Sequence, residues 1–193
     1  MKQNINRSIK FSLTIAVITF VLAAIFSVVS SSLLNQVTWS IGLLIILVIV
    51  MTGILFDMVG IASTAADEAP FHAMAAEKVT GSKEAVIIIR NADRFSSFCN
   101  DVIGDISGIV SGAATVVVIL QISTLLGHAE GSTMEIIFSV ALTSLVACLT
   151  VGGKAIGKYF AIHYSTTIII WTGKCISFIE NKLKIQIFKK DKK

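Results

Sequence analysis

The chain has 193 residues, of which 54% are hydrophobic and only 15% are charged, and its formal net charge is +4. Charged residues are absent from three long stretches, at 11–56, 106–129 and 136–153. Because a helix needs roughly 20 apolar residues to cross the hydrocarbon layer, this distribution excludes an ordinary soluble protein and predicts an integral membrane protein. The expected fold class is all-α, with four transmembrane helices and short juxtamembrane amphipathic helices.

Four membrane spans are predicted in chain order, at residues 11–33, 38–61, 95–126 and 133–151. The first span follows three basic residues, as the apolar part of a signal peptide does, but it is too long for one. We therefore expect a retained helix. On this basis residues 1–36 form an extra N-terminal transmembrane helix, residues 37–185 form the main transmembrane domain, and residues 186–193 form a basic cytoplasmic tail.

The positions of the 16 lysines and arginines predict the orientation of the spans. They fall in three groups: residues 2–10, residues 78–94, and residues 154–193. The two short connections at 35–37 and 127–132 contain none. The excess of basic residues in cytoplasmic loops then places both termini and the segment 66–94 in the cytoplasm, in a multi-pass protein of the plasma membrane. The basic charge indicates attraction to the lipid bilayer, and no basic patch with interleaved aromatics predicts a nucleic-acid partner.

Two short helices are predicted in the cytoplasmic segment 66–94. Pro70 suits the first turn of a helix, and the acidic residues just before it lie near the positive end of the helix dipole. Gly81 interrupts the pattern, and a second short apolar helix starts at Ala85. After Lys158, an apolar stretch with scattered charges and aromatics is typical of an interfacial helix rather than a fifth span.

Small residues recur every four positions in the third span, at Gly104, Gly108 and Gly112. Residues at this spacing line one face of a helix and let another backbone approach closely. The pattern predicts a helix-packing face, either within the chain or between two protomers.

Four oxygen-bearing residues in or near the spans are candidate metal ligands, namely Asp57, Asn100, Asp101 and Asp105. Ionisable groups inside spans are costly, so each is a candidate functional residue. Asp101 and Asp105 share a helix face, and carboxylate and amide oxygens suit hard cations such as Mg²⁺. The other interpretation is that these groups lie at the cytoplasmic interface, where they are solvated or paired with Lys154.

Three ordered motifs carry a family resemblance: MAAEKVTGSKEA at 74–85, NADRF at 91–95 and GGKAIGK at 152–158. Together they resemble the transmembrane domain of the cyclin-M/CorC (CorB-like) magnesium and cobalt transport family, over residues 38–183. The resemblance implies a bacterial inner-membrane protein, divalent-cation transport with Mg²⁺ as a transported ion, and a homodimer. It implies no resident cofactor. The cytosolic nucleotide-sensing domains that follow in larger members have no counterpart within these 193 residues.

The cation site that the resemblance implies is degenerate in this sequence. By spacing from NADRF, the family's serine falls on Asp57 and a family glutamate falls on Gly60. In GGKAIGK the family's cation-site glutamate falls on Lys154, which makes Lys154 a candidate for closing the site. Its ammonium would occupy the space of a metal, because a buried acid left unpaired is expensive.

The family's paired asparagines are displaced as well. The Gly-Asn-Asn motif falls on residues 102–104, and Asn100, Asp101 and Asp105 flank it. Three aspartates against one lysine leave negative charge for a different cation site. The expected function is therefore an ion-transport role, and the alternative is a non-transporting scaffold or partner subunit that Lys154 closes.

An enzyme is not expected. Two aspartates on neighbouring spans are the arrangement of intramembrane aspartyl proteases, and Asp57 and Asp105 would form such a carboxylate pair. The glycine motif of those proteases is incomplete here, because Val102 stands where a glycine is needed. The three histidines of the chain are dispersed, without the spacing of a zinc site or a catalytic triad.

Overall fold

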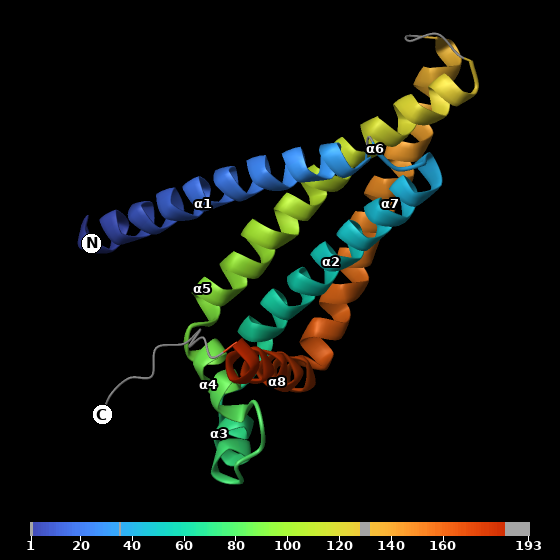
Figure 1. The fold of residues 1–193 in the computed structure, drawn as a ribbon. Coiled ribbons are helices and arrows are strands. Elements are labelled where there is room, and N and C mark those ends of the chain that lie inside the picture. The colour runs from blue at the N-terminus through green and yellow to red at the C-terminus, as the bar shows by residue number, and fades with distance from the viewer. Residues whose placement is uncertain (1, 35, 128–131, 184–193) are drawn as a thin grey trace. The chain divides into compact units, whose positions relative to one another are not determined.

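The structure is a computed structural model that describes residues 2–34, 36–127 and 132–183, and these residues contain helices and no strand (Figure 1). The tail predicted at 186–193 and His128 in the second connection lie outside the described residues. The helices are α1 (Lys2–Leu34), α2 (Trp39–Ala65), α3 (Ala69–Ala76), α4 (Ser82–Arg90), α5 (Ala92–Ser97), the π-helical segment η1 (Phe98–Gly104), α6 (Asp105–Leu125), α7 (Thr133–His163) and α8 (Ser165–Leu183).

Four helical stretches are long and apolar enough to cross a membrane, as the sequence predicts. They are Ile9–Leu34, Trp39–Ala65, Ala92–Leu125 and Thr133–His163. The last is 31 residues long and continues 12 residues past the predicted end at Val151. The difference arises because hydropathy marks only the apolar part of a helix, whereas backbone hydrogen bonding continues through the lysines that follow.

The chain divides into two compact units. The first unit comprises residues 1–55 and 101–154, and the second comprises residues 56–100 and 155–193. Each unit therefore combines two stretches that are distant in the sequence.

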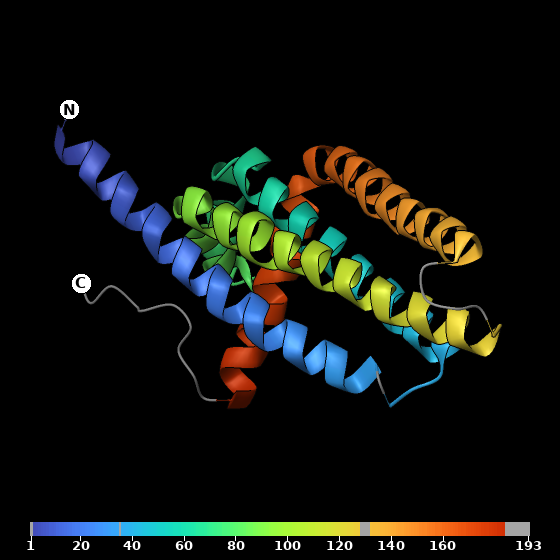
Figure 2. The same cartoon turned by 90° about the horizontal axis from the view of Figure 1, so that it is seen from above.

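In the first unit, α1 packs against α6 and crosses it at an angle (Figures 1 and 2). Val102, Ile106 and Val110 are buried along this contact at helical spacing. Gln121 ties the end of α6 to the connection after α1, because its side-chain amide donates to the carbonyls of Leu34 at 2.8 Å and Val37 at 3.2 Å. The Leu34 carbonyl also accepts a turn hydrogen bond of 3.4 Å from the Val37 N–H, so Gln121 adds a second donor there and supplies a donor to the Val37 carbonyl. Carbonyls of this kind are the groups that a helix end leaves open.

Glycines mark close helix approaches in the first unit, and of the three predicted glycines only Gly104 lies at one of them. A Cβ atom on Gly53 of α2 would lie 2.7 Å from the Cβ of Ser107 and 3.6 Å from the carbonyl oxygen of Gly104. Gly104 therefore packs against α2. Gly108 and Gly112 have no atom of another element within 4 Å of an added Cβ. Their packing role stays a prediction for contact between protomers.

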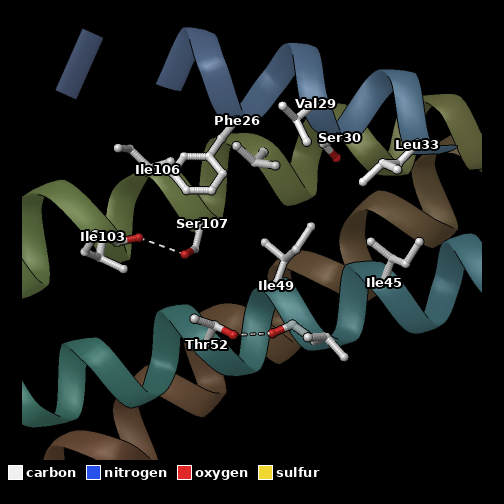
Figure 3. A pocket seen from close by; sticks show the side chains of 12 residues that line it. Phe26, Val29, Ser30, Leu33, Ile45, Ile49, Thr52, Ile103, Ile106 and Ser107 are labelled. Atoms are coloured by element: carbon white, nitrogen blue, oxygen red, sulfur yellow. Dashed lines mark hydrogen bonds between the residues drawn. The ribbon is translucent and has the colours of Figure 1, made fainter. Parts of the chain in front are cut away.

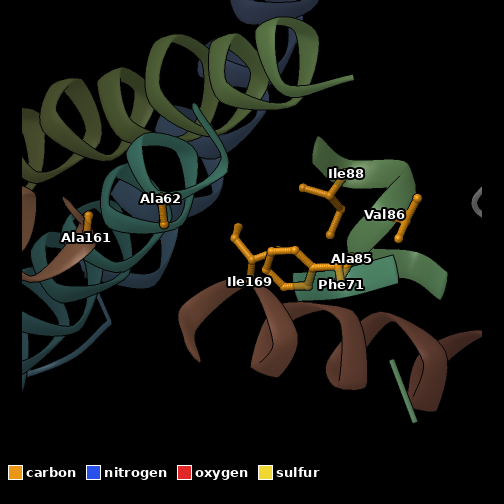
Figure 4. Close-up of a cluster of buried hydrophobic side chains, with 7 residues drawn as sticks. All are labelled: Ala62, Phe71, Ala85, Val86, Ile88, Ala161 and Ile169. Carbon is orange, nitrogen blue, oxygen red and sulfur yellow. The ribbon is translucent and has the colours of Figure 1, made fainter. Parts of the chain in front are cut away.

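In the second unit, α3, α4 and α8 enclose a small core (Figure 4). Phe71 of α3, Ile88 of α4 and Ile169 of α8 are each fully buried in it. Burying a large apolar side chain contributes about 1.5–3 kcal/mol, so this cluster supplies much of the stability of the packing of α3 and α4 against α8. Two short helices in segment 66–94 are therefore confirmed, with Pro70 in the first turn of α3 as predicted.

The backbones of α4 and α8 meet at a pair of glycines. A Cβ atom on Gly173 would lie 3.2 Å from the backbone nitrogen of Ala85 and closer still to the carbonyl oxygen of Gly81. Gly81 precedes α4 with a φ of 85°, a left-handed conformation that side chains disfavour. The glycine read from the sequence as an interruption is therefore both a turn residue and a contact residue.

Candidate functional site

The predicted ligands are divided between the two units. Asp57 and Asn100 belong to the second unit, and Asp101, Asp105 and Lys154 belong to the first. Among the described residues, no three His, Cys, Asp or Glu side chains form a group that could hold a metal ion.

Asn100 lies in the π-helical segment η1, between α5 and α6. Its amide nitrogen donates to the hydroxyl of Ser96 at 3.2 Å. Its carbonyl oxygen Oδ1 is buried and accepts no hydrogen bond from any described residue. A buried acceptor without a donor costs about 1–3 kcal/mol, and π-helical turns occur frequently at functional sites. The sequence pattern gives no signal for η1, so this feature was not predicted.

Asn100 faces α2 at Gly60. A Cβ atom on Gly60 would overlap the Asn100 carbonyl oxygen and would lie 3.1 Å from the Cβ of Cys99. Glycine is therefore the residue that lets this amide reach the backbone of α2. Asp57, which is half-buried, lies one turn before Gly60 on the same helix. The second unit thus places an amide oxygen within about one helical turn of a carboxylate-bearing residue.

In the first unit, Lys154 of α7 lies next to Asp105, the first residue of α6. The Lys154 Nζ is 3.8 Å from the Asp105 Oδ1, which is ion-pair distance but beyond hydrogen-bond length. The side chains of Asp105 and Lys154 are 65% and 27% exposed within the chain. Asp101 is also exposed. The structure therefore brings Lys154 together with Asp105, one of the groups that the sequence offers as its possible partners.

The first unit contains a cavity of about 350 Å³ between α1, α2 and α6 (Figure 3). Its lining is almost wholly apolar. Three hydroxyl-bearing residues line the cavity. The Thr52 hydroxyl donates to the Val48 carbonyl, and the Ser107 hydroxyl donates to the Ile103 carbonyl. Ser30 Oγ is buried without a partner among the described residues. Because few oxygens point into it, this cavity suits hydrocarbon and does not suit a cation.

A polar cluster joins α3 and α4 on the surface of the second unit. Glu68 Oε1 accepts from Arg90 Nε at 2.6 Å and lies 2.7 Å from His72 Nε2. These hydrogen bonds lower the pKa of the Glu68 carboxyl from its ordinary value, and the bond from Arg90 has the larger effect. Glu68 is one of the acidic residues before Pro70 that the sequence places near the positive end of the α3 dipole, and it is the N-cap residue of α3, without a side-chain capping hydrogen bond. Its long-range partner Arg90 could not be read from the sequence.

The fold defines a class: an all-helical protein with four helices of membrane-spanning length and several shorter helices. No protein-family model, curated protein or solved structure matches the chain.

Proposed function

We propose that this chain is a multi-pass membrane protein with a role in divalent-cation transport, related to the cyclin-M/CorC family and carrying a rearranged cation site. The substrate class is a hard or borderline divalent ion, with Mg²⁺ first and Co²⁺ second. Asp57, Asn100, Asp101 and Asp105 are the proposed ligands. Open space beside the α6 glycines supports a homodimer, since small residues allow a second helix to approach closely.

One observation carries the proposal, the buried Asn100 carbonyl oxygen that no described donor satisfies. An amide oxygen is a ligand type that hard cations accept, and Asp101 follows it directly in the chain. Asn100 also fills the space beside Gly60, where the related family has a glutamate. A side chain at position 60 would displace the Asn100 amide from this place. The site is therefore rearranged around Asn100 rather than simply lost.

The test measures the thermal unfolding of the full chain in detergent with and without Mg²⁺. An ion present at 100 times its Kd stabilises the folded state by about 2.7 kcal/mol. For a chain of this size we expect Tm to rise by about 5–11 °C. Asn100→Leu, which keeps the volume but removes the oxygen, is expected to abolish this rise.

A matched pair of variants tests the carboxylates. Asp101→Asn is expected to reduce Mg²⁺ flux into reconstituted vesicles by at least about tenfold, because charged ligands dominate the affinity of such sites. Asp93→Asn, which changes another exposed aspartate in α5, is the control and should retain full flux. Equal flux in both variants would refute the ligand assignment.

A second candidate function rests on the 3.8 Å contact between Lys154 and Asp105. In a non-transporting scaffold or partner subunit, the Lys154 ammonium takes the place of the ion. The wild-type chain would then show no metal-dependent rise in Tm, whereas Lys154→Gln would show one. A rise in the wild type favours transport, a rise only in the variant favours the scaffold, and no rise in either contradicts both.

A further inference from the structure

Helix α8 has two faces of different character. One face is buried against α4 and carries Ser165, Ile169 and Gly173, which are four residues apart. The opposite face carries Trp171 and Phe178, whose exposed fractions are 63% and 65%. These two aromatics are seven residues apart and so lie on one line of the helix. Packing within the second unit therefore leaves a large apolar stripe of α8 uncovered.

The uncovered stripe is bordered by positive charge. The Nζ atom of Lys174 lies 5.4 Å from the centroid of the Trp171 ring, and that of Lys182 lies 5.6 Å from the Phe178 ring. The only acidic residue of α8, Glu180, is half-buried and lies seven residues after Gly173, on the packed side. The exposed face of α8 thus presents aromatic rings and ammonium groups without a carboxylate.

The chain leading into α8 indicates what covers this face. Helix α7 is 31 residues long, about 46 Å at 1.5 Å per residue, whereas the hydrocarbon layer is about 30 Å thick. Its end therefore extends past the hydrocarbon when α7 crosses a membrane. Exposed Tyr159 and Tyr164 lie at this end, and tyrosine and tryptophan concentrate at the headgroup level. Helix α8 begins at the next residue, Ser165.

We propose that the exposed face of α8 docks on the anionic headgroup layer of the membrane that α7 crosses. Trp171 and Phe178 insert at the boundary of the acyl chains, and Lys174 and Lys182 contact lipid phosphates. A second copy of this face fits poorly, because a symmetric contact would bring lysines of both copies together without acids between them. This inference rests on the membrane insertion that the proposed function requires, but it does not need transport.

The test uses the full chain in vesicles and the fluorescence of Trp171. The chain has two tryptophans, so Trp39→Phe leaves Trp171 as the only one. Brominated lipids quench tryptophan on contact, and brominated phosphatidylglycerol is compared with brominated phosphatidylcholine. We expect quenching by both lipids and a preference of at least about fivefold for the anionic lipid, given roughly fivefold per surface lysine.

Two double variants in this background test the lysines. Lys174→Gln with Lys182→Gln is expected to lower the preference for anionic lipid to about one. Lys78→Gln with Lys83→Gln removes two exposed lysines from the α3–α4 region and should leave the preference unchanged. Equal losses in both double variants would show a general charge effect and would overturn the assignment to α8.

The remaining outcomes separate this inference from the proposed function. Trp171→Phe leaves Trp39, at the start of α2, as a reporter of membrane insertion. Quenching of Trp39 without quenching of Trp171 overturns the docking of α8 and leaves membrane insertion standing. Absence of quenching at both positions overturns both. Blue-shifted Trp171 emission without quenching shows that protein covers the face, which also overturns the proposal.

Discussion

The glycine contact between α4 and α8 gives the sharpest prediction of stability. In Gly173→Ala, the added Cβ would meet the carbonyl oxygen of Gly81, its carbonyl carbon at 3.1 Å and the Ala85 nitrogen at 3.2 Å. All three are backbone atoms, so no side chain can rotate away. The two helices must separate, which opens the core around Phe71 and Ile169.

The magnitude follows from two opposing effects. Forcing an extra carbon into a packed contact costs about 1–3 kcal/mol, and we take the upper value because the neighbours are backbone. Replacing glycine by alanine within a helix stabilises the folded state by about 0.5–1 kcal/mol. The net loss is about 2 kcal/mol, which for a chain of this size lowers Tm by about 4–8 °C.

Gly152→Ala is the matched control, because a Cβ at Gly152 of α7 has no other atom within 4 Å. It should raise Tm by about 1–4 °C through helix propensity alone. Thermal unfolding in one detergent compares the two variants, and limited proteolysis within α8 should increase only in Gly173→Ala. If the Tm of Gly173→Ala equals or exceeds that of Gly152→Ala, the close contact of α4 with α8 is wrong.

Two further predictions concern polar contacts. Because hydrogen bonds lower the pKa of Glu68, its contribution to stability is complete above its ordinary value of 4.5 and is lost as pH falls through the lower folded value. Arg90→Gln should therefore unfold at lower temperature than the wild type at pH 6, with a smaller difference at pH 3; a constant difference would contradict this. Gln121→Leu should cost about 1–2 kcal/mol in denaturant unfolding, because it leaves the Val37 carbonyl without its side-chain donor and removes one of two donors to the Leu34 carbonyl. An unchanged midpoint would show that the Val37 carbonyl needs no donor.

The sequence predicts features that depend on neighbouring residues in the chain. Charge-free stretches predict the four long helices, because crossing hydrocarbon requires a continuous apolar run whatever the helices later contact. Pro70 predicts the start of α3, because its fixed φ and missing N–H suit a first helical turn. Gly81 predicts the break before α4, because it adopts a left-handed conformation at low cost.

The candidate site could be predicted only in part. Asp101 and Asp105 stand out because charge is rare beside apolar spans, and Lys154 stands out for the same reason. The pairing of Lys154 with Asp105 depends on how α6 and α7 are rotated. The small residues of the third span predict a close contact between helices. In the structure this contact lies between Gly53 and Gly104, because the facing surface of α2 decides which glycine is covered.

What the sequence by itself determined is where the chain is apolar enough to cross a membrane and where its helices begin and break. Only the tertiary structure decided which groups meet, such as the Asn100 carbonyl at Gly60 and the backbone of Gly173 at Gly81. The physical reason is the range of the interactions. Hydropathy and backbone preference act over a few residues, whereas these contacts join residues 40 or more positions apart, through helix rotations that no local pattern records.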